Sequence, residues 1–196
     1  MGRFCPVVGA GCDHGGVLRL RRTSWPRELT EAVAVASRHS PGGKEDVLAA
    51  VQLIDGNWVA GSRAALYLPT ETEGAVRRVG WEKIERAGWD SEESVLRVYE
   101  TTSFGTPLRA TELKVEDPGR FGQLLRERID ASVLVQRHVP LAGKKGVRVV
   151  GRRNPSDPNA PVSWNFVLDK GLEPTQPGLV DSAEAALAAV RDEFGV

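Results

Sequence analysis

The chain has 196 residues, of which 41% are hydrophobic and 27% are charged. These proportions are ordinary for a globular protein and exclude a chain that is disordered throughout. The length is sufficient for one domain with a substantial appendage. The 26 basic and 26 acidic residues give a formal net charge of zero, so no overall field steers the protein toward nucleic acid or an anionic membrane.

The cysteine content and hydropathy point to a reducing compartment. Only Cys5 and Cys12 are present, and both precede the strand-rich region, so no disulfide framework is expected to hold the fold together. No apolar run approaches the roughly 20 residues that a membrane-spanning helix needs. Arginine greatly outnumbers lysine, a usage typical of GC-rich bacterial genomes. We therefore expect a cytoplasmic bacterial protein.

The first 44 residues are expected to form an arm and one short helix. Residues 1–23 show neither a helical nor a strand period, which predicts a mobile segment. Their glycines depart from the spacing of a nucleotide-binding loop, and Cys5, Cys12 and His14 lack the companion ligands of a metal site. A helix is expected to follow, with Ser24 as its cap and a breaker at 40–43.

Seven short apolar runs separated by turn residues fill the middle of the chain. They span 47–54, 58–60, 65–68, 76–81, 84–89, 95–99 and 108–115. Their connections are too short for crossover helices, which predicts antiparallel pairing in a small barrel or curled sheet. The Asp-Gly pair at 55–56 favours a tight hairpin between the first two strands. The tryptophans Trp58, Trp81 and Trp89 are expected in the core.

One amphipathic helix closes this middle unit. Asp117 is expected to cap it, with Pro118 at the first helical position. A stripe at helical spacing is predicted to plug one opening of the barrel, and it consists of four apolar residues and one arginine: Phe121, Leu124, Leu125, Arg128 and Ile129.

Three further strands and a helix are predicted after this unit, at 133–141, 147–152, 162–168 and about 180–194. The predicted fold class is therefore α+β, an antiparallel barrel or curled sheet closed by a helix, with a β-rich extension and a terminal helix. The domain division is 1–44 for the partly disordered arm and helix, 45–131 for the closed unit, and 132–196 for the extension packed on it.

Two segments of the closed unit carry a family likeness. Residues 58–68 (Trp-Val-Ala-Gly-Ser-Arg-Ala-Ala-Leu-Tyr-Leu) read as a strand, a turn with Ser and Arg, and a second strand. Residues 79–87 (Val-Gly-Trp-Glu-Lys-Ile-Glu-Arg-Ala) give a further strand and turn. Together with Leu96-Arg97-Val98 and the closing helix, they resemble the pleckstrin-homology (PH)-like superfamily, specifically bacterial PH and GRAM-type domains. The whole chain also resembles an uncharacterised bacterial protein family.

The resemblance implies a PH-like fold over 45–131 and a scaffold for binding proteins, peptides or membranes. Many members bind phosphoinositides through basic residues between their first two strands. Here that loop is Asp55-Gly56-Asn57, which has no Lys or Arg to receive a phosphate.

A basic segment in the extension is the candidate binding surface. It comprises Arg137, His138, Lys144, Lys145, Arg148, Arg152 and Arg153. Because alternate strand residues share a face, Arg148 and Arg152 are expected to join the turn lysines on one side. Bound phosphate groups are one use for such a face, and a solvated hairpin edge that resists aggregation is the other.

Catalysis has little support in the sequence. His138 could serve as a base, but no local motif provides a nucleophile beside it, and the carboxylates from Glu82 to Glu93 are assigned to solvent. We expect a non-catalytic binding or adaptor module with a protein partner and with no cofactor or metal. The alternative is a module that recognises phosphate in nucleic acid or anionic lipid through 144–153, and an enzyme centred on His138 is a third hypothesis.

Overall fold

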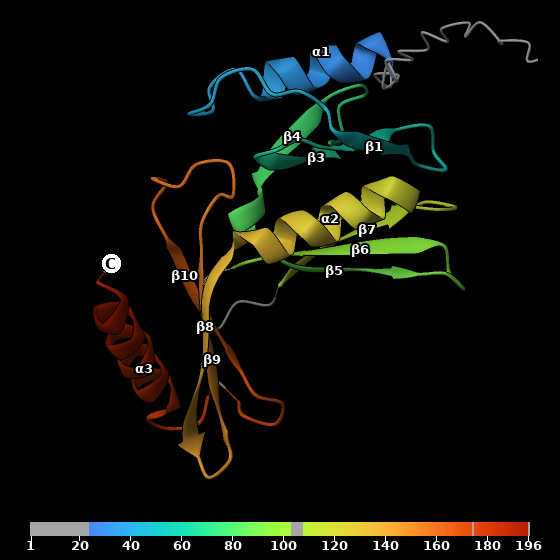
Figure 1. Cartoon of the computed structure of the whole chain (residues 1–196). Helices are drawn as coiled ribbons and strands as arrows, with labels where there is room; N and C mark the ends of the chain where they lie inside the picture. The colour runs from blue at the N-terminus through green and yellow to red at the C-terminus, as the bar shows by residue number, and fades with distance from the viewer. Residues whose placement is uncertain (1–23, 103–107, 174, 196) are drawn as a thin grey trace, which may run out of the picture.

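The computed structural model describes residues 24–102, 108–173 and 175–195. The predictions for the N-terminal arm, its glycines and Cys5, Cys12 and His14 lie outside these residues. Within them the chain forms three α-helices, one 3-10 helix and three antiparallel sheets (Figure 1). The α+β class is confirmed.

The first sheet is a four-stranded meander. Its strands are β1 (Ala49–Gln52), β2 (Trp58–Gly61), β3 (Ala65–Pro69) and β4 (Val76–Gly80), paired in chain order. The tight turn between β1 and β2 is confirmed, because Gly56 has a φ of 88° and the Asn57 amide donates to Asp55 Oδ1 at 3.0 Å. A left-handed φ costs glycine little, which explains the Asp-Gly pair.

The second sheet follows a short 3-10 helix, η1 (Trp81–Lys83). It contains β5 (Ile84–Asp90), β6 (Val95–Glu100) and β7 (Arg109–Lys114), again in chain order. Of the two predicted forms, a barrel or a curled sheet, the closed barrel is wrong, since neither sheet is closed and the two remain separate. The chain leaves the first sheet at η1, after β4, so β5 begins a new sheet in place of pairing with β4.

The main core lies between these two sheets and α2 (Gly119–Ser132), which runs along the opening between them (Figure 1). The predicted stripe is confirmed, since the four apolar residues expected to face inward are all buried there. The helix begins one residue later than expected, because Pro118 is the N-cap. Asp117 still satisfies an end group, as its Oδ1 accepts from the Gly119 amide at 2.8 Å.

The three tryptophans of the middle unit have different environments. Trp81 is fully buried in the main core and Trp58 is partly buried beneath α1. The core assignment of Trp89 is wrong, because it lies at the end of β5, where its side chain is 41% exposed.

Helix α1 (Arg27–Ala36) covers the outer face of the first sheet (Figure 1). Its buried residues Leu29 and Val33 pack against Ala60, Ala65 and Tyr67. The predicted Ser24 cap is wrong, since Pro26 is the N-cap and makes no side-chain cap bond. This packing leaves the following loop against the edge of the first sheet.

The extension is a three-stranded sheet with a helix on one face. The strands β8 (Val133–Ala142), β9 (Lys145–Arg152) and β10 (Ser163–Leu168) are arranged with β9 in the centre, and α3 is Leu179–Phe194. Val147, Val149, Trp164 and Phe166 pack with α3 in a core of their own. The β8–β9 hairpin points away from the main core (Figure 1). None of the helices in the described ranges combines the length and hydropathy needed to cross a membrane.

Candidate functional site

The structure places the seven residues of the predicted basic surface on different faces of the extension. Lys144, Lys145 and Arg148 are exposed on the β8–β9 hairpin. Arg137 lies on the opposite face from Arg148, where its Nη2 forms an ion pair with Glu193 Oε1 of α3 at 2.7 Å. The alternation of strand side chains therefore divides the set, because neighbouring residues point to opposite faces.

His138 lies on the same face as Arg148 and is paired with a carboxylate. Its Nε2 is 2.8 Å from Asp169 Oδ2, which also accepts from the Gly146 amide at 2.8 Å. These contacts, with the His138 bond as the largest cause, hold the pKa of the Asp169 carboxyl below its usual range. Neither member of this exposed pair contacts a nucleophile among the described residues. The pair links strand β8 to the residue that directly follows β10.

Arg152 does not belong to the surface, which corrects the sequence prediction. Its side chain is buried where β9 meets the main core, and it donates to Ser132 Oγ at 2.9 Å and to the Glu85 carbonyl at 2.9 Å. Burial lowers the pKa of its guanidinium below the usual range. Arg153 is half-buried and donates from Nη1 to the Pro158 carbonyl at 2.7 Å. Arg152 therefore joins the extension to the main core, while Arg153 stabilises the β9–β10 loop.

A cleft of about 1000 Å³ lies elsewhere, between the extension and the first sheet. Four segments that are distant in sequence form its walls, and we call it the interface cleft. They are the loop 41–48 after α1, the β2–β3 turn at 63–64, the segment 78–83 of β4 and η1, and the β9–β10 loop at 154–163. A concave site between two packed units is the usual location of a ligand pocket.

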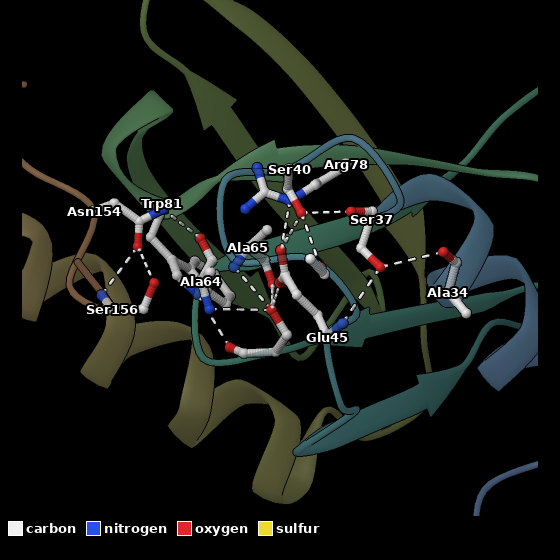
Figure 2. Close-up of polar contacts among 12 residues, drawn as sticks. Ala34, Ser37, Ser40, Glu45, Ala64, Ala65, Arg78, Trp81, Asn154 and Ser156 are labelled. Carbon is white, nitrogen blue, oxygen red and sulfur yellow. Dashed lines mark hydrogen bonds and ion pairs between the residues drawn. The ribbon is translucent and has the colours of Figure 1, made fainter. Parts of the chain in front are cut away.

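The wall of the interface cleft contains an ordered ion pair. Arg78 Nε donates to Glu45 Oε1 at 2.7 Å, and Ser62 Oγ makes a short hydrogen bond to Glu45 Oε2. Ser40 Oγ also reaches Glu45 Oε1, at 3.3 Å. Figure 2 shows Glu45 on the loop that follows α1, with its carboxylate directed toward Arg78. The Glu45 side chain is only 8% exposed, so this pair is shielded from solvent and from screening.

The Ser62 hydroxyl stabilises the β2–β3 turn through its hydrogen bonds. Its Oγ accepts from the Ala64 amide at 3.1 Å and from the Ala65 amide at 2.9 Å while it donates to Glu45. Trp81 Nε1 donates to the Ser62 carbonyl at 3.2 Å. With its lone pairs occupied and its side chain buried, Ser62 is a structural hydroxyl and is not placed to attack a substrate.

Tyr67 lies behind this wall. It is fully buried between the first sheet and α1, and its hydroxyl makes no hydrogen bond of acceptable geometry with a described residue. Burial, with the nearby negative charge of Glu45 as the second cause, raises the pKa of Tyr67 to about 12. The phenol is therefore neutral at physiological pH.

The opposite wall is attached to the first sheet by one side chain. Asn154 Nδ2 donates to the Ala64 carbonyl at 3.1 Å, and its Oδ1 accepts from Ser156 Oγ at 2.8 Å (Figure 2). The bond between Asn154 and Ala64 joins residues 90 positions apart. It links the wall formed by the β9–β10 loop to the wall formed by the β2–β3 turn.

The rim of the interface cleft carries charges of both signs. Lys44, Arg63 and Lys83 are exposed, and none forms an ion pair with a residue in the described ranges. Asp46 and Asp157 contribute negative charge, and Leu48 adds an apolar contact because it is 43% exposed. The cleft can therefore bind a polar ligand that has both donors and acceptors, with some apolar surface.

Glu82 corrects the assignment of the middle carboxylates to solvent. Its side chain folds back over Gly80, where any Cβ would collide with the carboxylate. Its Oε2 is buried and accepts no hydrogen bond from a described residue. The absence of a side chain at Gly80 thus allows a carboxylate to form part of the cleft wall.

Sequence reasoning missed the interface cleft because its walls come from four separated segments. The one part of the cleft that the sequence indicated was the turn at Ser62-Arg63, because it belongs to the segment that carries the family likeness. Three or more His, Cys, Asp or Glu side chains arranged to hold a metal ion do not occur within the described ranges. No protein-family model, curated protein or solved structure matches this chain.

Proposed function

We propose that the protein is a non-catalytic binding module that recognises a peptide segment of a partner protein in the interface cleft. The observation that carries this proposal is the combination of a large cleft, an ordered ion pair in its wall, and rim charges of both signs that form no ion pair with a described residue. A peptide presents donors, acceptors and side chains of either charge along one strand, so it complements such a lining.

The polar groups of the cleft favour binding over catalysis. A nucleophile needs an adjacent base and an accessible attacking atom. The Ser62 hydroxyl is buried and accepts from two backbone amides, and Glu45 is engaged by Arg78. These groups are already fixed in the free protein. They therefore lose little conformational entropy when a ligand binds, which lowers the cost of binding.

The PH-like relationship remains part of this proposal. The order of four strands, three strands and a closing helix supports it, as does the burial of the α2 stripe between the two sheets. The β1–β2 turn carries Asp55, and the β3–β4 turn carries Glu71 and Glu73. These acidic turns disfavour an anionic lipid headgroup at this end of the first sheet.

The test is selection of peptides from a random displayed library by the full chain. Wild type is expected to enrich a defined set of peptides, and the double variant Arg63→Glu/Lys83→Glu should lose them. The matched control is Lys144→Glu/Lys145→Glu, which makes the same change in charge outside the cleft. Retention of thermal stability in both variants shows that they fold. Equal binding by wild type and the cleft variant would contradict the proposal.

A second candidate function is phosphate recognition on the β8–β9 hairpin. It is favoured by Lys144, Lys145 and Arg148, which are exposed and without ion pairs among the described residues. It is weakened by the burial of Arg152 and by the Asp169 carboxylate beside His138. Salt-sensitive binding to heparin or to phosphatidylserine vesicles that is lost in the Lys144→Glu/Lys145→Glu variant would support this function.

A further inference from the structure

We infer that Arg78 makes the interface cleft selective for an acidic side chain of the bound peptide. This inference rests on the proposed function of the cleft and adds the chemistry of its ligand. It assigns to the terminal nitrogens of Arg78 a carboxylate from aspartate or glutamate.

The hydrogen bonds of Arg78 leave part of its guanidinium available. Only Nε is engaged by a described residue, through the bond to Glu45. The side chain lines the cleft and is 21% exposed, while Nη1 and Nη2 donate to no residue in the described ranges. A guanidinium presents its donors in a rigid fork, so fixing Nε also fixes the direction of the two remaining nitrogens.

The neighbouring arginine on the same strand forms hydrogen bonds with both of its terminal nitrogens. Arg77 donates from Nη1 and Nη2 to the two carboxylate oxygens of Glu100, at 2.9 and 2.5 Å, and from Nη2 to Thr111 Oγ1. Its terminal nitrogens are thus occupied within the fold. Arg77 and Arg78 are adjacent on β4 and point to opposite faces of the strand. The terminal nitrogens that donate to no described residue are therefore those on the cleft side.

Arg78 is held by a partner that is itself fixed in place. Glu45, its partner, is held by Ser62 and Ser40 and is largely shielded from water. A side chain fixed in this way loses little rotamer freedom on binding, which increases the affinity obtained from each hydrogen bond. Charge-assisted bonds from a guanidinium to a carboxylate are also about twice as strong as neutral ones.

The charge balance of the cleft favours a carboxylate over a phosphate. Four cations of the lining, Lys44, Arg63, Arg78 and Lys83, are matched by the four carboxylates Glu45, Asp46, Glu82 and Asp157. A phosphate group carries a charge of about −1.5 to −2 at neutral pH and needs a surplus of positive charge around it. A carboxylate carries a single charge and can accept from Nη1 and Nη2 of Arg78, so a lining with balanced charge opposes it less than it opposes a phosphate.

The experiment measures binding of synthetic peptide sub-libraries to the full chain by fluorescence anisotropy. One central position is fixed as Glu, Asp, Gln or phosphoserine, and the flanking positions are randomised. Wild type is expected to bind the Glu and Asp sub-libraries about tenfold or more tightly than the Gln sub-library, as the loss of a charge-assisted bond predicts. Equal binding of Glu and Gln, or preference for phosphoserine, would overturn the inference.

Two variants assign the preference to Arg78. Arg78→Gln removes the fork but leaves Glu45 unpaired, so Glu45→Gln/Arg78→Gln is measured as well, because it removes both charges together. Loss of the Glu preference in the folded double variant supports the inference, and persistence of that preference overturns it. If binding survives without any acidic preference, the cleft function stands and only the inference fails. Unchanged binding by Arg63→Glu/Lys83→Glu contradicts the cleft function itself.

Discussion

Arg152 and Glu85 are 67 residues apart in sequence and are joined by a hydrogen bond of 2.9 Å from Nη2 to the main-chain carbonyl. The same guanidinium donates from Nη1 to Ser132 Oγ at the end of α2. The β9–β10 loop, which forms one wall of the interface cleft, begins directly after Arg152. This side chain therefore connects the extension to the main core at the point where the position of that wall is set.

The first prediction concerns this connection. Arg152→Met keeps much of the side-chain volume but leaves the Glu85 carbonyl without its buried donor. We expect the free energy of unfolding to fall by about 2 to 4 kcal/mol, since each unsatisfied buried group costs about 1 to 3 kcal/mol. Urea denaturation measures the change. Arg148→Met, on the same face of β9 but exposed, is the control and should shift stability by no more than about 0.5 kcal/mol. Equal effects would show that Arg152 is not a connecting residue.

The second prediction concerns Tyr67 and high pH. Because its pKa in the folded protein, about 12, lies above the usual value of 10.0, the neutral phenol stabilises the fold fully below pH 10. That contribution is lost as the pH rises from 10 toward 12, and it amounts to up to about 2 to 3 kcal/mol. Tyr67→Phe has no phenol to ionise and should therefore lack this loss.

The measurement for Tyr67 is the difference in unfolding free energy between the two proteins at a series of pH values. Lysines and arginines titrate in both proteins, so their effects cancel in the difference. Tyr99→Phe serves as the control, since Tyr99 stacks beneath Arg86 on the outer face of the second sheet. Parallel pH profiles for wild type and Tyr67→Phe would refute the prediction.

The third prediction tests the closing helix. Leu125 is 2% exposed in the main core, so Leu125→Ala should lower the free energy of unfolding by about 2 to 5 kcal/mol. Leu134 lies just after the same helix and is 51% exposed, so Leu134→Ala should change it by less than about 0.5 kcal/mol. Chemical denaturation distinguishes the two outcomes. A small cost at Leu125 would mean that α2 does not seal the space between the sheets.

The fourth prediction concerns glycine in the strands. A Cβ on Gly146 would overlap the Val139 carbonyl of the paired strand β8, and the backbone there cannot rotate away. We expect Gly146→Ala to destabilise the extension by about 2 to 3 kcal/mol. A methyl group on Gly88 in β5 would meet no atom within 4 Å, so Gly88→Ala should be neutral or slightly stabilising. Thermal unfolding of the two variants compares them directly, and similar melting temperatures would contradict the expected clash.

Local patterns were sufficient to predict the α-helices and strands of the described chain, but not η1, whose first residue Trp81 was expected in a strand. The strand runs, the turn at Asp55-Gly56 and the stripe around Leu125 follow from periodicities and turn preferences that depend on neighbours a few residues away. The same patterns failed where an element ends or a side chain meets a distant one. The closed barrel, one of the two predicted forms, was wrong because the turn at η1 depends on the burial of Trp81 between the sheets.

The amino-acid sequence by itself determined the class of the fold, the order of its elements and the residues of the α2 stripe. The tertiary structure alone decided that Arg152 is buried, that Trp89 is exposed and that two nitrogens of Arg78, beside a cleft, donate to none of the described residues. The physical reason is that burial and hydrogen-bond partners depend on long-range packing, as in the Asn154 bond to Ala64, and no local period in the sequence encodes them.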